Sequence, residues 1–78
     1  MWEVHYSLEA ATYLEDNGQL IADLFFAMES LAESEGWPLS DFDESIEGFI
    51  SWWVNGHMVV YERIELKKIA RVIWIKPD

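Results

Sequence analysis

The chain has no cysteine, so neither a disulfide framework nor a thiolate metal site can hold its 78 residues together. It has no apolar run close to the roughly 20 residues of a transmembrane helix. Its first residues show no basic segment followed by an apolar one, as a secretion signal would. We therefore expect a single small domain over residues 1–78, located in the cytoplasm, with no membrane association and no cofactor.

Basic residues are missing from the first part of the chain. Residues 1–47 hold twelve acidic side chains and no lysine or arginine, and the net charge of the whole chain is −10. This charge argues against direct nucleic-acid binding, because lysine and arginine are what neutralise phosphates. The acidic half either keeps the protein soluble or meets a basic partner. In the second case Asp41, Asp43, Glu44 and the helix acids would let the chain imitate nucleic acid and inhibit a basic protein.

Aromatic residues are plentiful, with five Trp, four Phe and three Tyr available for a core. Alternating apolar and polar residues over 2–7 predict a strand. Ser7 can cap a helix over 8–16, which Asn17-Gly18 ends. Apolar residues recur at helical spacing between Leu20 and Ala32 and predict a second, longer helix. Residues 35–47 show no sustained period and are expected to form a connecting loop.

Two runs rich in aromatic and β-branched residues, 49–54 and 57–64, flank the dipeptide Asn55-Gly56. This pattern is typical of a hairpin with a two-residue type I′ turn, in which both central residues have positive φ. A further turn near 65–67 leads to a last strand over 68–75. The order is β-α-α-β-β-β, an α+β fold with two helices packed on one face of a mainly antiparallel four-stranded sheet.

The tight turn also predicts which residues share a face of the sheet, because directly opposed residues point the same way. Ile50, Trp52, Val59 and Tyr61 are expected to face the helices. The opposite face carries Phe49, Ser51, Trp53, Met58, Val60 and Glu62. We expect this second face to be an uncovered interaction face without lysine or arginine, unless the loop or the C-terminus folds over it.

No catalytic motif is present, and the candidate catalytic residues are Arg63, Arg71 and Lys76. The hairpin register puts Arg63 on the side of the helices, where an acid from the helical half would pair with it. The two histidines, His5 and His57, have no neighbouring cluster of ligating residues, so we expect no metal site.

Residues 4–10 (Val-His-Tyr-Ser-Leu-Glu-Ala) and 56–61 (Gly-His-Met-Val-Val-Tyr), in this order of elements, resemble the RelE/ParE superfamily of toxin–antitoxin toxins. The resemblance spans nearly the whole chain. It implies a toxin-like protein that an antitoxin peptide wraps and neutralises. The RelE branch cleaves mRNA in the ribosome with lysines and arginines of the open sheet face, and the ParE branch inhibits DNA gyrase. Met58 stands where the ribonuclease pattern has arginine.

We therefore expect a divergent member of this superfamily that acts mainly by protein binding, with either an antitoxin partner or a second copy. The enzymatic alternative is a residual ribosome-dependent mRNA endoribonuclease that uses the three basic candidates. The third hypothesis is the acidic inhibitor described above, whose complex should be sensitive to salt.

Overall fold

The fold is described here from a computed structural model, which covers the backbone of residues 1–78 and all side chains except those of Gln19 and Leu20. Its strands are β1 (Glu3–Tyr6), β2 (Phe42–Ile46), β3 (Phe49–Val54), β4 (His57–Ile64) and β5 (Ile69–Pro77). Its helices are α1 (Leu8–Asn17) and α2 (Ala22–Glu29), with 3-10 turns at Gly18–Ile21, Ser30–Ala32 and Glu65–Lys67.

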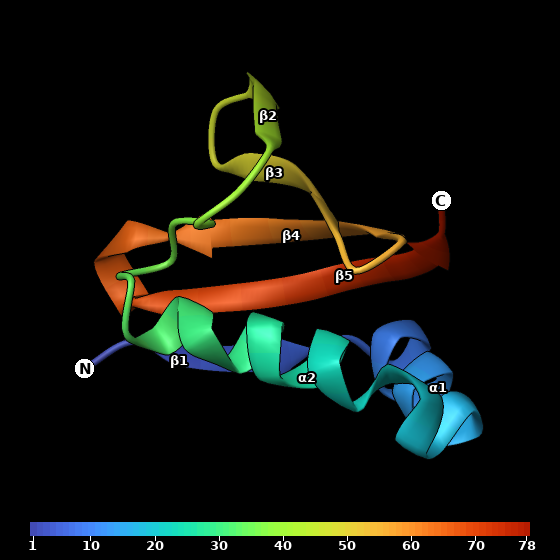
Figure 1. The fold of residues 1–78 in the computed structure, drawn as a ribbon. Helices are drawn as coiled ribbons and strands as arrows, with labels where there is room; N and C mark the ends of the chain where they lie inside the picture. Colours follow the sequence, from blue (N-terminus) through green and yellow to red (C-terminus); the bar gives the residue numbers. More distant parts are fainter.

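The five strands form one mixed sheet in the order β1-β5-β4-β3-β2 (Figure 1). The first strand runs parallel to β5, and the other neighbours are antiparallel. The helical part of the chain makes most of its contacts with β1 and β5, and β2 lies at the opposite edge of the sheet (Figure 1). The predicted α+β class and the mainly antiparallel character of the sheet are confirmed, and the helices contact β1 and β5.

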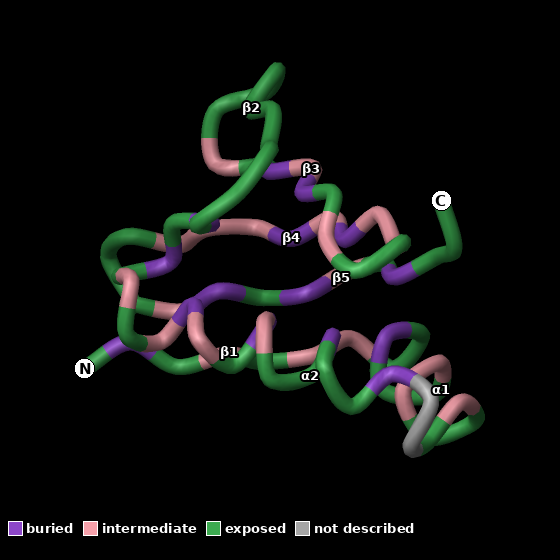
Figure 2. The backbone as a smooth tube through the Cα atoms, viewed as in Figure 1, coloured by how far each residue is buried: buried purple, intermediate pink, exposed green. Residues whose placement is uncertain are grey.

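The predicted loop over 35–47 and the count of four strands are wrong. Phe42–Ile46 forms β2, which pairs with β3 and so makes a fifth strand, giving the order β-α-α-β-β-β-β. All five residues of β2 are exposed, as Figure 2 shows along its length. A strand that buries neither face has no alternation of apolar and polar residues, so its sequence carried no strand signal. Backbone pairing with β3 defines it instead.

The second predicted helix is present, but its ends tighten into 3-10 turns. Four of its apolar residues, Ile21, Leu24, Met28 and Leu31, are buried in the core. They pack against the helix-facing residues of the hairpin, among them Ile50 and Trp52. The side chain of Leu20, which belonged to the predicted apolar stripe, lies outside the described residues.

Ser7 joins the first strand to the first helix and to the sheet. Its Oγ accepts the Ala10 N–H at 3.1 Å, as predicted for the cap of α1, and donates to the carbonyl of Ile73 at 2.6 Å. The Ser7 N–H donates to the carbonyl of Val72. These bonds end β1 beside the middle of β5 and turn the chain into α1. The second half of β5 therefore extends beyond β1.

Two tyrosine hydroxyls bond to acceptors within the fold. Tyr61, which is buried, donates to the carbonyl of Gly36 at 2.6 Å, and Tyr6 donates to the carboxylate of Glu29. Burial is the main cause that raises the pKa of Tyr61; Arg63 opposes the rise and Glu44 adds to it. Burial, followed by the Glu29 contact, raises the pKa of Tyr6.

These raised pKa values predict a loss of stability in alkali. Below pH of about 10, the ordinary tyrosine pKa, both hydroxyls are protonated in the folded and unfolded chains. Above it the unfolded chain loses these protons first, so the free energy of unfolding falls as the pH rises. Urea unfolding between pH 8 and 11 should show this fall, and the double variant Tyr6→Phe/Tyr61→Phe should show a shallower one. Equal slopes in the two proteins would contradict the assignment.

Candidate functional site

The hairpin has the predicted register, and this register defines an uncovered face of the sheet. Asn55 and Gly56 have φ of 49° and 73°, as a type I′ turn requires. Directly opposed pairs run from Val54 with His57 to Phe49 with Glu62. We use the term open face for the side of the sheet turned away from the core. Its β3 and β4 residues are the six predicted ones: Phe49, Ser51, Trp53, Met58, Val60 and Glu62.

Large apolar side chains are exposed along the open face. Phe49 is 40% exposed and Trp53 39%, although the other side of the same strand buries Ile50 and Trp52. Met58 and Val60 lie between these aromatic residues and β5 and are half-buried. The result is an apolar surface across β3 and β4, a feature that marks interaction sites in soluble proteins.

The fifth strand adds Arg71, Trp74 and Lys76 to the open face, so the expectation of a face without cations is wrong. Arg71 lies opposite Glu62, Trp74 opposite Val60 and Lys76 opposite Met58. The register of β5 shifts between Val60 and Tyr61. Strict alternation would have put Arg71 and Trp74 on opposite faces of the sheet, and this bulge places both on the open face. Trp74, which is 50% exposed, is a residue of the candidate site that the sequence did not predict.

The two cations of the open face each have a partner and lie apart. Arg71 Nη1 is 3.5 Å from Glu62 Oε1, and Lys76 Nζ is 5.7 Å from the centroid of the Trp74 ring. Five residues along a strand separate them, roughly 16 Å at about 3.3 Å per residue. They cannot both hold one phosphate.

The third basic candidate, Arg63, lies on the other face of the sheet. Its guanidinium lies between the rings of Trp2 and Trp37, with its Cζ 4.6 and 4.2 Å from their centroids. Nη2 is 2.8 Å from Glu65 Oε2, and Nε donates to the carbonyl of Glu35. The helix-side position is confirmed, but the carboxylate partner comes from the basic half of the chain and not from the helical half. With its side chain 12% exposed, Arg63 is a packing residue.

The segment before β2 does not cover the open face. Phe42 is paired with Trp52, whose side chain belongs to the core, and the Phe42 ring contacts Trp37. Ser40 accepts the indole N–H of Trp52 at 2.7 Å. The segment therefore packs on the helix side of the sheet, and the open face keeps its apolar surface.

The histidines occupy separate places. His57 Nδ1 donates to the carbonyl of Asn55 at 2.9 Å, and its Nε2 is 2.9 Å from the hydroxyl of Tyr13. His5 is 2.9 Å from Glu3 on β1. Within the described part of the chain, no three His, Asp or Glu side chains gather to hold a metal ion.

The acidic residues do not form one surface. Asp41, Asp43 and Glu44 lie in or next to β2, at one edge of the sheet, whereas the helices lie by the opposite edge (Figure 1). The acids of α1 and α2 are therefore remote from those of β2. A nucleic-acid-like inhibitor would need a continuous row of charges, and the fold divides them instead.

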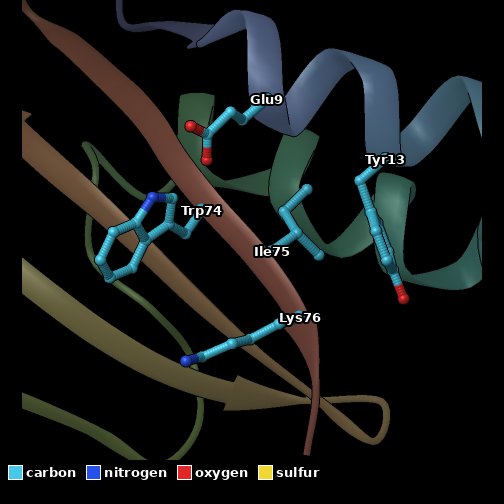
Figure 3. A pocket seen from close by; sticks show the side chains of 5 residues that line it. All are labelled: Glu9, Tyr13, Trp74, Ile75 and Lys76. Carbon is cyan, nitrogen blue, oxygen red and sulfur yellow. The ribbon is translucent and has the colours of Figure 1, made fainter.

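A cleft of about 300 Å³ opens between α1 and the second half of β5 (Figure 3). Glu9 and Tyr13 of α1 form one side of it, and Trp74 and Lys76 project from β5. Ile75 lies between them at the strand.

The chain matches no protein-family model, no curated protein and no solved structure. None of the described helices is long and apolar enough to span a membrane. The fold and the site thus define its class: an α+β domain in which helices contact β1 and β5 of a five-stranded mixed sheet and the open face exposes aromatic side chains.

A pair of neighbouring tryptophans tests the assignment of faces. Replacing buried Trp52 with alanine should lower the free energy of unfolding by about 3 kcal/mol or more. Replacing Trp53 with alanine should cost about 1 kcal/mol, since that side chain is 39% exposed and lies outside the core. Urea unfolding of the two variants measures the difference. Equal losses would mean that both faces are covered.

Proposed function

We propose that this chain is a divergent member of the RelE/ParE toxin superfamily and acts by binding a protein partner through the open face. The helical layer on one side of a mainly antiparallel sheet agrees with this family, apart from the added strand β2. The observation that carries the proposal is the row of exposed aromatic side chains, Phe49, Trp53 and Trp74, on an otherwise well-packed sheet. Aromatic residues of this kind supply most of the binding energy at protein interfaces.

The composition of β3 and β4 also indicates that a partner covers the open face. β3 and β4 carry apolar side chains on both sides, a pattern typical of strands that are buried on both faces. The chain's own helices cover only one of them. A partner segment on the open face would complete a three-layer arrangement.

Charge favours a foreign partner over a second copy. Two chains of net charge −10 repel each other, and the acidic residues lie around both edges of the sheet. A partner with an apolar strip flanked by lysine or arginine fits this surface, as an antitoxin-like peptide would.

The same geometry does not favour the endoribonuclease alternative. Stabilising the charge of an RNA-cleavage transition state needs converging donors. Arg63 lies on the far side of the sheet, and Arg71 is paired with Glu62. Met58, which lies opposite Lys76, is apolar and supplies no donor. Purified protein should therefore leave mRNA intact on ribosomes.

Replacing Trp53 with glutamate should weaken binding of the partner by about tenfold or more, because the variant buries a charge in an apolar interface. The tagged chain is expressed in its native host, growth is followed, and the co-purified protein is identified and titrated against the purified variants.

The matched control is Phe26→Glu, which makes the same kind of change at an exposed ring of α2. It should leave the affinity unchanged. A partner that binds the Trp53→Glu variant as tightly as the unaltered chain would refute the proposal, and so would a stable homodimer that binds nothing else.

A further inference from the structure

The second half of β5 has a neighbouring strand on one side only. β1 pairs with Ile69–Val72 and then ends, whereas β4 pairs with β5 as far as Pro77. Among the described residues, no strand pairs with the other edge of residues 73–77. Figure 3 looks onto β5 in this region, with α1 beside it and β4 behind.

The hairpin fixes the direction of the backbone groups of β5. Val54 and His57 close the two-residue turn, so His57 directs its N–H and C=O to β3, and Met58 directs its own to β5. Lys76, opposite Met58, therefore faces β4. The N–H of Asp78, two residues on, donates to the carbonyl of Gly56 at 2.9 Å, which agrees with this alternation.

It follows that Ile75 directs its N–H and C=O away from β4, toward the unpaired edge. Pro77 faces the same way, and a residue without an N–H is tolerated there because no strand needs one. On the same edge the carbonyl of Ile73 already accepts the hydroxyl of Ser7. Among the described residues, the backbone N–H and C=O of Ile75 thus have no strand partner on this edge, while its side chain belongs to the core and the residue is 7% exposed.

The cleft described above lies at this edge. Its volume of about 300 Å³ suits a short stretch of peptide, and Ile75 lines it together with Glu9 and Trp74. Glu9 makes no ion pair with any described residue, although Lys76 lines the same cleft. The cleft therefore combines backbone hydrogen-bonding groups, a half-exposed indole ring, the carboxylate of Glu9 on α1 and the ammonium group of Lys76, which lies by the Trp74 ring. The excess of acids in the first 47 residues makes the α1 side of the cleft the one that favours a basic ligand.

We propose that the edge of β5 at Ile75 accepts an extended, basic segment of a partner protein as an added strand. Backbone groups of the segment pair with Ile75, one of its lysine or arginine side chains reaches Glu9, and an apolar side chain contacts Trp74. A second copy of this chain is disfavoured, because the approaching surfaces would carry the same excess of acids. The site shares Trp74 with the open face but includes neither Phe49 nor Trp53, and it does not rest on the proposed function.

Amide hydrogen exchange of the full chain, followed by NMR, tests the free edge. The amide of Ile75 should exchange at least tenfold faster than those of Trp74 and Lys76, whose N–H groups pair with β4. Adding a capped seven-residue peptide of alternating valine and lysine should slow exchange at Ile75 and shift the resonances of residues 74–76. The same peptide with its two central amides N-methylated should do neither.

The charge contact is tested with a matched pair on α1. Glu9→Gln should weaken binding of the peptide about fivefold, and Glu15→Gln, outside the cleft, should change it less than twofold. Trp53→Glu should leave it intact, which separates this site from the open face. Protection of Ile75 equal to that of its neighbours, no shift at 74–76 with millimolar peptide, or protection that appears only on dimerisation would overturn the proposal.

Discussion

The register of β3 against β4 decides which side chains the rest of the fold can bury. A two-residue turn at Asn55-Gly56 leaves one pairing, and a slip by one residue would exchange every side chain between the two faces of the sheet. With this pairing, Ile50, Trp52, Val59 and Tyr61 form a continuous apolar layer for the helices. The same pairing obliges Trp53 and its neighbours to face the other way. The core and the open face are thus two consequences of one turn.

Hydrogen bonds at the ends of elements then place the remaining parts. Ser7 stops β1 beside the middle of β5 and starts α1, which leaves the end of β5 without a second neighbour. Tyr61 and Trp52 hold the segment before β2 on the helix side through Gly36 and Ser40. Both sets of hydrogen bonds keep chain segments away from the open face. The open face is therefore exposed because these segments are held in other places.

The parts that could be predicted from the sequence are those with a local signal. The Asn-Gly turn, the alternation around it and the serine cap of α1 each depend on neighbouring residues, and each is present. β2 was not predicted, because it is defined by backbone pairing with β3 and its exposed residues show no strand pattern. Trp74 and Arg71 escaped because the bulge in β5 interrupts the alternation, and its position depends on pairing with β4. The ring partners of Arg63 were not predicted because Trp2 and Trp37 meet it only in three dimensions. Its carboxylate partner, Glu65, is only two residues away, but it reaches Arg63 through the 3-10 turn that follows β4.

The central claim is that one face of the sheet is covered by the chain itself and the other is open to a partner. A soluble paramagnetic gadolinium chelate broadens NMR signals according to their access to solvent, and the tryptophan indole N–H groups report on both faces. We expect strong broadening for Trp53 and Trp74 and little for Trp2 and Trp52, which are buried. Protection of Trp53 and Trp74 in the isolated monomer, at the level of Trp52, would contradict the account.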